Sequence, residues 1–204
     1  MSPEILIAYV LACILITLVP GPTVTLIVAN TLTHGVRAGL LSVAGTQLGI
    51  AVFVVVLAIG LASFIQTLGV WFDWLRFLGA AYLVWLGFRM VRNSGRLEDP
   101  GAVPAPRGGF FLQAFLVMLS NPKMLVFFGA FIPQFVSPNG DYVMQVLVLG
   151  AIAMTIAAIT DAAYALLTGR ARLFLTRARV RLISRVSGLF LIGGGVWLAL
   201  TRTR

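Results

Sequence analysis

Charged residues are scarce in this chain. Only 10% of its 204 residues are Asp, Glu, Lys or Arg, whereas 60% are hydrophobic and the mean hydropathy is +1.02. A soluble globule of this composition could not cover its surface with polar side chains. The composition therefore predicts an integral membrane protein.

Cysteine, histidine and acidic residues are scarcer still, and this excludes several classes of function. The single cysteine, Cys13, cannot form a disulfide, a thiolate metal cluster or a CxxC redox pair within one chain. One histidine and six acidic residues offer no cluster of metal ligands, so we expect neither a metal nor a cofactor. An intramembrane aspartyl protease needs two carboxylates at one site, and only Asp161 is well placed. We expect that the protein is not an enzyme.

Six apolar runs are long enough to cross a bilayer as helices, since a span needs about 20 residues. They cover residues 5–30, 38–63, 70–91, 110–135, 142–168 and 183–200. The third run contains Asp73 and Arg76, which we expect to pair at i,i+3 spacing near the interface. The sixth only just reaches spanning length after Arg185. The first lacks a basic leader and is too long for a signal peptide, so we expect it to be retained.

The arginines punctuate the apolar runs, which indicates membrane topology and no nucleic-acid partner. The loops between spans 1–2, 3–4 and 5–6 hold eleven of them: Arg37, Arg89, Arg92, Arg96, Arg107, Arg170, Arg172, Arg177, Arg179, Arg181 and Arg185. The other side holds three: Arg76, Arg202 and Arg204. Because cytoplasmic loops retain basic residues, this distribution predicts that both termini face out. Topology alone explains the stretch 170–185 better than specific binding of membrane lipid does.

A segment rich in proline and glycine, NSGRLEDPGAVPAPRGG, occupies residues 93–109 and reads as a linker. It separates two blocks of three spans, and an odd number of spans gives the blocks opposite polarity in the membrane. We therefore predict an all-α integral membrane protein of six transmembrane helices. Two inverted three-helix repeats, residues 1–91 and 110–204, would be joined by a cytoplasmic linker at 92–109.

Both blocks begin with a span that the sequence interrupts near its middle, by PGPT at residues 20–23 and by SNPK at 120–123. Proline removes a helical N–H and clashes with the carbonyl four residues back, while glycine permits unusual dihedrals, so both helices should unwind or kink. Paired breaks of this kind are typical of midplane binding sites in secondary transporters. A kink that merely shapes packing is the less favoured alternative. The predicted site residues are Pro20, Gly21, Pro22, Thr23, Asn121, Pro122 and Lys123.

Lys123 and Asp161 are the charges that lie deepest in the predicted spans. A lysine at a helix centre costs about 2.5–3.5 kcal/mol on insertion scales and usually faces a cavity. Two interpretations stay open: the two residues form an ion pair, or Asp161 is a separate protonatable carboxylate. In either case Asp161 is the best candidate for proton coupling. His34 could join a relay, although a histidine at the membrane interface is the favoured interpretation.

The second span carries glycines at 35, 39, 45 and 49, which we interpret as packing positions. Such small-residue faces make a homodimer reasonable. Gln47, between the last two glycines, is expected either in the wall of the site or in an interhelical hydrogen bond.

Together these motifs resemble the LysE/RhtB family of bacterial amino-acid exporters. The resemblance rests on residues 20–22 (PGP), the glycines that follow, residues 121–123 (NPK) and residues 161–164 (DAAY), and it covers essentially the whole chain. It implies a six-span inner-membrane transporter that exports amino acids or close derivatives by proton antiport. It does not select among substrates. The alternatives are a non-transporting scaffold or sensor subunit, or an exporter of another small solute or ion.

The chemistry of the breaks suggests how a zwitterionic substrate would bind between them. N–H groups around Gly21 to Thr23, with Lys123, would receive its carboxylate, since helix N-termini and cations favour anions. Carbonyls freed by the prolines, with Asn121, would receive its ammonium. Asp161 would gain and lose a proton as one repeat moves against the other.

Overall fold

The computed structural model describes residues 2–59, 69–93, 104–137, 140–172, 174 and 176–200. Every regular element within these residues is a helix, which confirms the predicted all-α class. The helices are α1 (Pro3–Leu18), α2 (Pro22–His34), α3 (Val36–Ala58), α5 (Gly69–Asn93), α6 (Gly109–Leu119), α7 (Pro122–Val126), α8 (Tyr142–Arg172) and α9 (Arg177–Leu200). Between α7 and α8 come a π turn, η2 (Phe127–Phe131), and a 3-10 turn, η3 (Ile132–Phe135).

Three helices are long and apolar enough to cross a membrane alone: α3, α8 and residues 178–200 of α9. Two more spans arise if each bent pair, α1 with α2 and α6 with the segment 122–135, is one span. The described residues therefore supply up to five of the six predicted spans, and α5 is not among them. The expected contact between the side chains of Asp73 and Arg76 lies outside the described residues, as does most of the predicted linker.

The predicted interruptions occur in both first spans. The axes of α1 and α2 differ by 49°, and those of α6 and the segment that follows it differ by 50°. Each second half begins with a proline, Pro22 or Pro122. Proline suits this position because the first N–H groups of a helix have no intrahelical partner. Near-equal bends therefore arise from similar local chemistry in the two halves of the chain.

The last two helices are longer than the sequence analysis predicted. α8 continues to Arg172 rather than ending near residue 168, and α9 begins at Arg177 rather than near 183. Arginine is a good helix former, and its long stem lets the guanidinium reach the membrane surface from within a helix. The prediction that the arginines of residues 170–185 lie in a loop was wrong, because all six lie within α8 or α9.

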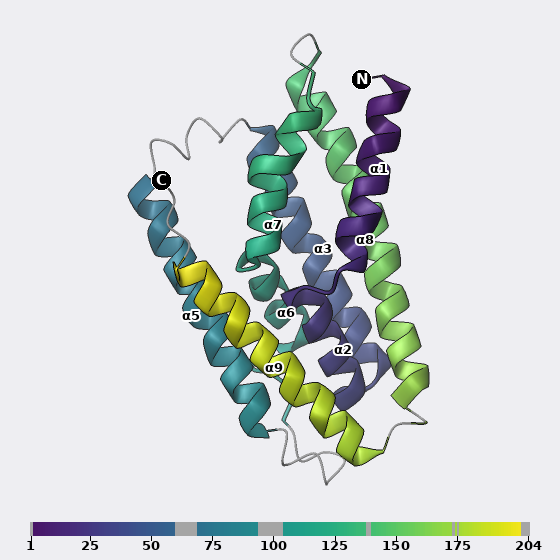
Figure 1. Ribbon diagram of the computed structural model, residues 1–204, viewed down its shortest axis with the longest axis vertical. Coiled ribbons are helices and arrows are strands. Elements are labelled where there is room, and N and C mark those ends of the chain that lie inside the picture. Colours follow the sequence, from purple (N-terminus) through teal and green to yellow (C-terminus); the bar gives the residue numbers. More distant parts are fainter. Residues whose placement is uncertain are drawn as a thin grey trace.

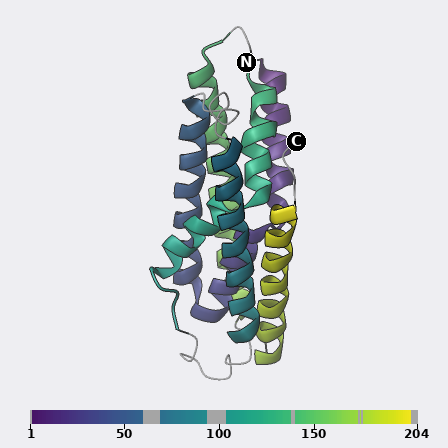
Figure 2. The same ribbon diagram turned by 90° about the vertical axis from the view of Figure 1, so that its left-hand side faces the viewer.

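The helices form one bundle in which α3 contacts α8 and α5 contacts α9 (Figure 1). The view in Figure 2 confirms that α5 and α9 lie side by side. One apolar cluster, with Tyr9, Phe127 and Leu149, joins α1, η2, α3 and α8. A second, with Leu26 and Leu191, joins α2, α5, α6 and α9. The two halves of each broken span thus pack largely in different clusters, although Met118 at the end of α6 belongs to the first.

Gly39, Gly45 and Gly49 of α3 serve contacts within the chain, which confirms their interpretation as packing positions. Gly35 differs, because it forms the turn between α2 and α3 with a φ of +91°, a conformation that favours glycine. A Cβ atom at Gly45 would overlap the backbone carbonyl of Phe111 in α6, and one at Gly49 would overlap the Met118 side chain. A Cβ at Gly39 would overlap Thr31 of α2. The small-residue face on which a homodimer was expected is therefore already covered by α6 and α2.

The ends of the elements alternate between the two ends of the molecule (Figure 1). The N-terminus and the start of α8 lie at one end, which we call the N-terminal end. The turn between α2 and α3, the end of α5 and the start of α9 lie at the other, which we call the arginine-rich end. It carries nine described arginines: Arg37, Arg89, Arg92, Arg107, Arg170, Arg172, Arg179, Arg181 and Arg185.

Candidate functional site

The two helix breaks meet, and Lys123 is the residue that joins them. Its ammonium donates to the backbone carbonyl of Ile16 and, at 2.7 Å, to that of Val19. Both carbonyls belong to the C-terminal end of α1, where the last carbonyls have no intrahelical partner and the helix dipole favours a cation. Lys123 thus satisfies polar groups that the first break sets free.

Asn121 fixes the second break and contacts the first. Its side-chain oxygen accepts from the Lys123 N–H at 3.1 Å and so caps α7. Its amide nitrogen lies 3.4 Å from Thr23 Oγ1 on α2 and donates to it. Asn121 is fully buried, and such an amide needs partners in an apolar interior. The sequence analysis predicted that Asn121 and the freed carbonyls would receive the ammonium of a substrate. In the structure these groups already have partners, since Asn121 contacts Thr23 and the α1 carbonyls accept from Lys123.

Gly21 provides the space in which the breaks approach each other. A Cβ atom there would lie 3.4 Å from Lys123 Cδ and 3.8 Å from its ammonium nitrogen. These are ordinary van der Waals distances, and the φ angle of −114° is open to any residue. The requirement at this position is therefore one of room: a methyl group fits, whereas a larger side chain would displace Lys123.

Asp161 and Tyr164 bring α8 to the same region. Asp161 is only 6% exposed, and its Oδ2 lies 3.4 Å from Thr46 Oγ1 of α3. Among the described residues no ion pair joins it to Lys123, so the direct pairing left open by the sequence is not formed here. The Tyr164 hydroxyl donates to the Leu18 carbonyl at the break, at 3.0 Å.

Gln47 forms an interhelical hydrogen bond, which was one of its two expected roles. In the amide orientation that satisfies both ends, it donates to the Met154 carbonyl and accepts from the Ala158 N–H, each at 3.2 Å. Both partners belong to the backbone of α8. The structure therefore brings Gln47 to the α3–α8 contact and shows no hydrogen bond between it and either break.

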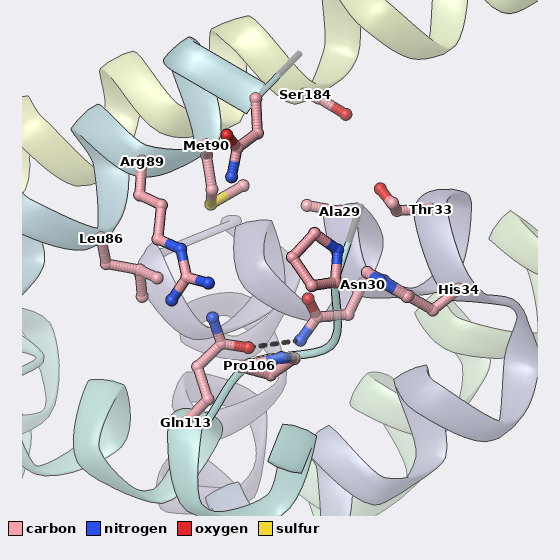
Figure 3. A pocket seen from close by; sticks show the side chains of 12 residues that line it. Ala29, Asn30, Thr33, His34, Leu86, Arg89, Met90, Pro106, Gln113 and Ser184 are labelled. Carbon is pink, nitrogen blue, oxygen red and sulfur yellow. Dashed lines mark hydrogen bonds between the residues drawn. The ribbon is translucent and has the colours of Figure 1, made fainter. Parts of the chain in front are cut away.

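A cavity with polar and apolar lining lies near the arginine-rich end, and Figure 3 shows its lining. Its volume is about 70 Å³, and a cavity of about 360 Å³ beside it shares Arg89, Pro106 and Gln113 with it. Asn30 of α2 donates to Gln113 of α6 at 3.1 Å and to Ser42 of α3 at 3.0 Å. We call the first volume the Arg89 cavity.

The structure also locates His34 in the wall of the Arg89 cavity. Its ring packs against that of Phe110, with the centroids 4.8 Å apart. His34 ends α2 at the arginine-rich end, which agrees with its interpretation as an interface residue. No described hydrogen bond links it to Asp161, the residue that a relay would have to reach.

Over residues 14–202 the chain matches the model of one protein family, the LysE type translocators. The chain belongs to the LysE family. It is 34% identical over 164 residues to the homoserine/homoserine lactone efflux protein of Salmonella typhi, with 80% of each chain covered. It is 30% identical over 201 residues to an uncharacterized membrane protein of Vibrio cholerae, with 98% of each covered.

A further relative is the leucine efflux protein of Klebsiella pneumoniae, which is 34% identical over 138 residues. That match covers 65% of this chain and 64% of the relative. No solved structure matches the chain. Membership of the LysE family confirms the resemblance drawn from the motifs and identifies a multi-pass membrane protein related to transporters rather than enzymes.

Several residues at the breaks and in the Arg89 cavity were not predicted from the sequence as site residues. Arg89 was counted only as a topology signal, and Tyr164 only as part of a motif. Asn30 and Gln113 were not considered, although each carried a recognisable signal. Asn30 follows Thr23 by seven residues and Gln113 precedes Ser120 by seven, so each lies on the same helix face as a break residue. An amide inside an apolar run, in register with a break, is the pattern to look for.

Proposed function

We propose that this protein is an inner-membrane exporter of amino acids or their close derivatives, with its substrate site where the two broken helices meet. The observation that carries the proposal is the contact between the breaks: Lys123 of one half is hydrogen-bonded to carbonyls at the break of the other half. The family match and the names of the efflux relatives support the same substrate class.

Substrate binding, in this proposal, replaces one ammonium group by another. In the structure, Lys123 fills the position at Ile16 and Val19 in which the ammonium of a zwitterion would be received. An incoming amino acid would take these carbonyls with its own ammonium and pair its carboxylate with the displaced Lys123. The exchange leaves no carbonyl unpartnered and no buried charge alone, both of which are costly in a membrane.

We propose Asp161 as the proton-coupling residue. Thr46 has one hydroxyl proton, and its oxygen lies 2.8 Å from the Val43 carbonyl but 3.4 Å from Asp161 Oδ2. The Thr46 hydroxyl proton is best placed in the shorter hydrogen bond to the Val43 carbonyl. A protonated Asp161 would then donate to the Thr46 oxygen across the longer contact. Loss of that proton would leave a buried carboxylate, whose charge would attract Lys123 away from the α1 carbonyls.

Alternating access would come from movement of two inverted repeats, 1–91 and 110–204, joined by the linker 92–109. Two contacts fit such a symmetry, because α3·α8 and α5·α9 each pair an element with its proposed equivalent. Towards the N-terminal end the site is closed by an aromatic cluster in which Tyr9 stacks on Phe127 and Phe131. The Arg89 cavity lies at the opposite end. With both termini periplasmic, this arrangement is an inward-facing one.

Transport into everted membrane vesicles tests the function directly. With an acidic lumen, vesicles that contain the wild-type protein should accumulate at least one of L-leucine, L-homoserine and homoserine lactone, the compounds for which the relatives are named. Accumulation should collapse when a protonophore dissipates the pH gradient. Lys123→Met, which keeps the apolar stem and removes the ammonium, should lose most of this uptake.

The matched control is Arg92→Gln, which removes a cation from an exposed position of α5 far from the breaks. It should transport like the wild type. Failure of the wild-type vesicles to accumulate any compound of a full amino-acid panel would reject the exporter and favour a scaffold or sensor subunit. Uptake that ignores the protonophore would keep the exporter and reject proton antiport.

A further inference from the structure

The Arg89 cavity combines buried polar groups with a cation. Arg89 is half-buried and lies over the Trp85 ring, 5.5 Å from its centroid. Within the described residues, no carboxylate side chain lines this cavity or the one beside it. A guanidinium presents several donors in a fixed planar arrangement that matches a carboxylate. In the described part of the chain, the Arg89 guanidinium faces a cavity and no carboxylate side chain.

A second observation independently indicates an occupant. Ser184 of α9 lines the Arg89 cavity and is only 5% exposed, yet its hydroxyl has no hydrogen-bond partner within the described residues. A buried polar group normally has a partner in the protein or in bound water or ligand. The cavity volume of about 70 Å³ also leaves room, since about 10–15 Å³ admits one water molecule.

Polar side chains connect the Arg89 cavity with the helix breaks. Figure 3 shows the side chains of Arg89 and Gln113 reaching towards each other, with Asn30 hydrogen-bonded to Gln113 beside them. The contact between Asn30 and Gln113 joins α2 to α6, and the contact between Thr23 and Asn121 joins α2 to the start of α7 at the breaks. Thr23 and Asn30 are seven residues apart on one face of α2, about 10 Å along its axis. Polar contacts of α2, first with α6 and then with the start of α7, thus lead from the cavity to the breaks.

We propose that the Arg89 cavity is an entry site that binds the α-carboxylate of a substrate before the substrate reaches the breaks. This inference rests on the proposed function and adds a specificity determinant to it. Arg89 receives the carboxylate, and the Gln113 amide and the Ser184 hydroxyl supply neutral hydrogen-bonding groups around it. The site therefore discriminates in favour of compounds with a free carboxylate. A compound whose carboxylate is blocked, and which keeps only its ammonium, gains nothing from Arg89.

The test measures KM at the cytoplasmic face of everted vesicles for two pairs of probes. L-leucine is compared with L-leucinamide, and L-homoserine with homoserine lactone, because the second member of each pair lacks the carboxylate. In Arg89→Gln the KM for L-leucine and L-homoserine should rise roughly tenfold or more, the loss expected for one charge-assisted bond. Maximum rates should stay within about twofold, and the KM of the blocked probes should not rise.

Two further variants separate binding from structure. Arg92→Gln removes a charge from the same helix end at an exposed position and should leave every KM as in the wild type. Arg89→Lys should restore part of the affinity for L-leucine, because it restores the cation without the planar arrangement of donors. An equal rise in KM for free and blocked probes, or no more change in Arg89→Gln than in Arg92→Gln, would overturn the entry site. Transport of the blocked probes alone would overturn it as well.

A binding experiment distinguishes failure of this inference from failure of the proposed function. The purified full-length protein is heated in detergent with L-leucine or with L-leucinamide, since a ligand that binds the folded state raises the Tm. If no vesicle transports any probe, the proposed function fails. A Tm increase that needs the carboxylate, and that Arg89→Gln removes, would still support the site. No such increase in the wild type would overturn it.

Discussion

Lys123 is the only lysine of the chain, and its ammonium lies against the end of α1 instead of in an ion pair. This explains how a cation can lie deep in an apolar bundle. The ammonium donates to two backbone carbonyls and lies at the negative end of the α1 dipole, which stabilises the cation. The two carbonyls gain a partner that they would otherwise lack in an apolar environment. Asp161 is held separately by its contact with Thr46. Mutation of Lys123 and mutation of Asp161 should therefore produce different transport defects.

Asp161→Asn keeps the size and hydrogen bonding of the side chain but cannot titrate. If Asp161 carries the proton, exchange of labelled for unlabelled substrate across the membrane should persist while uphill, pH-driven accumulation disappears. Vesicles preloaded with unlabelled L-leucine measure the exchange, and an imposed pH gradient measures the accumulation. Full proton-driven accumulation in Asp161→Asn would move the coupling role to another group.

At the scale of the element, the breaks were predictable and their partners were not. Proline and glycine act on the backbone of their own helix, so Pro20-Gly21-Pro22 and Pro122 reveal the interruptions without any tertiary information. The partner of Lys123 depends on how α1 and α7 approach each other in space. Gln47 is a similar case, because only the packed α3–α8 contact decides between its two expected roles. Residue type therefore predicts which groups need a partner, whereas the packing of the helices decides which partner they find.

A graded pair of substitutions at Gly21 tests the contact between the breaks. Gly21→Ala should transport at a rate within about twofold of the wild type, because its Cβ would meet Lys123 at ordinary contact distance. Gly21→Leu should abolish transport, since the larger side chain displaces Lys123 from the carbonyls. Folded yield, followed by size-exclusion chromatography in detergent, should remain near normal for both. Full activity in Gly21→Leu would reduce the motif to a packing kink.

At the scale of the whole molecule, the distribution of arginine predicts which ends of the helices lie together, but it does not predict the role of Arg89. It correctly grouped nine described arginines at one end of the bundle. The same interpretation treated Arg89 as one more topology signal, because a sequence does not distinguish an arginine that faces solvent from one that lines a cavity. The inverted repeats stay a prediction, although the similar bends of 49° and 50° agree with them.

The topology itself can be tested by labelling single cysteines in a Cys13→Ser background. Val103→Cys, in the linker, should resist a membrane-impermeant thiol reagent in intact cells and react only after permeabilisation. Ser2→Cys, at the exposed N-terminus, should react in intact cells and so serves as the positive control. Strong labelling of position 103 from outside would reverse the proposed orientation and make the Arg89 cavity an exit.

Replacement of the Lys123 ammonium on the α1 carbonyls by a substrate ammonium can be followed on the lysine itself. Because the chain has one lysine, protein labelled with ¹³C at the lysine ε-carbon gives one signal from the native sequence, which needs no assignment. The direct measurement is the position of this signal during titration with the substrate found in the vesicle assay. We expect a saturable shift that is absent when a non-transported amino acid is added instead. A signal that stays fixed while the same preparation transports the substrate would contradict it.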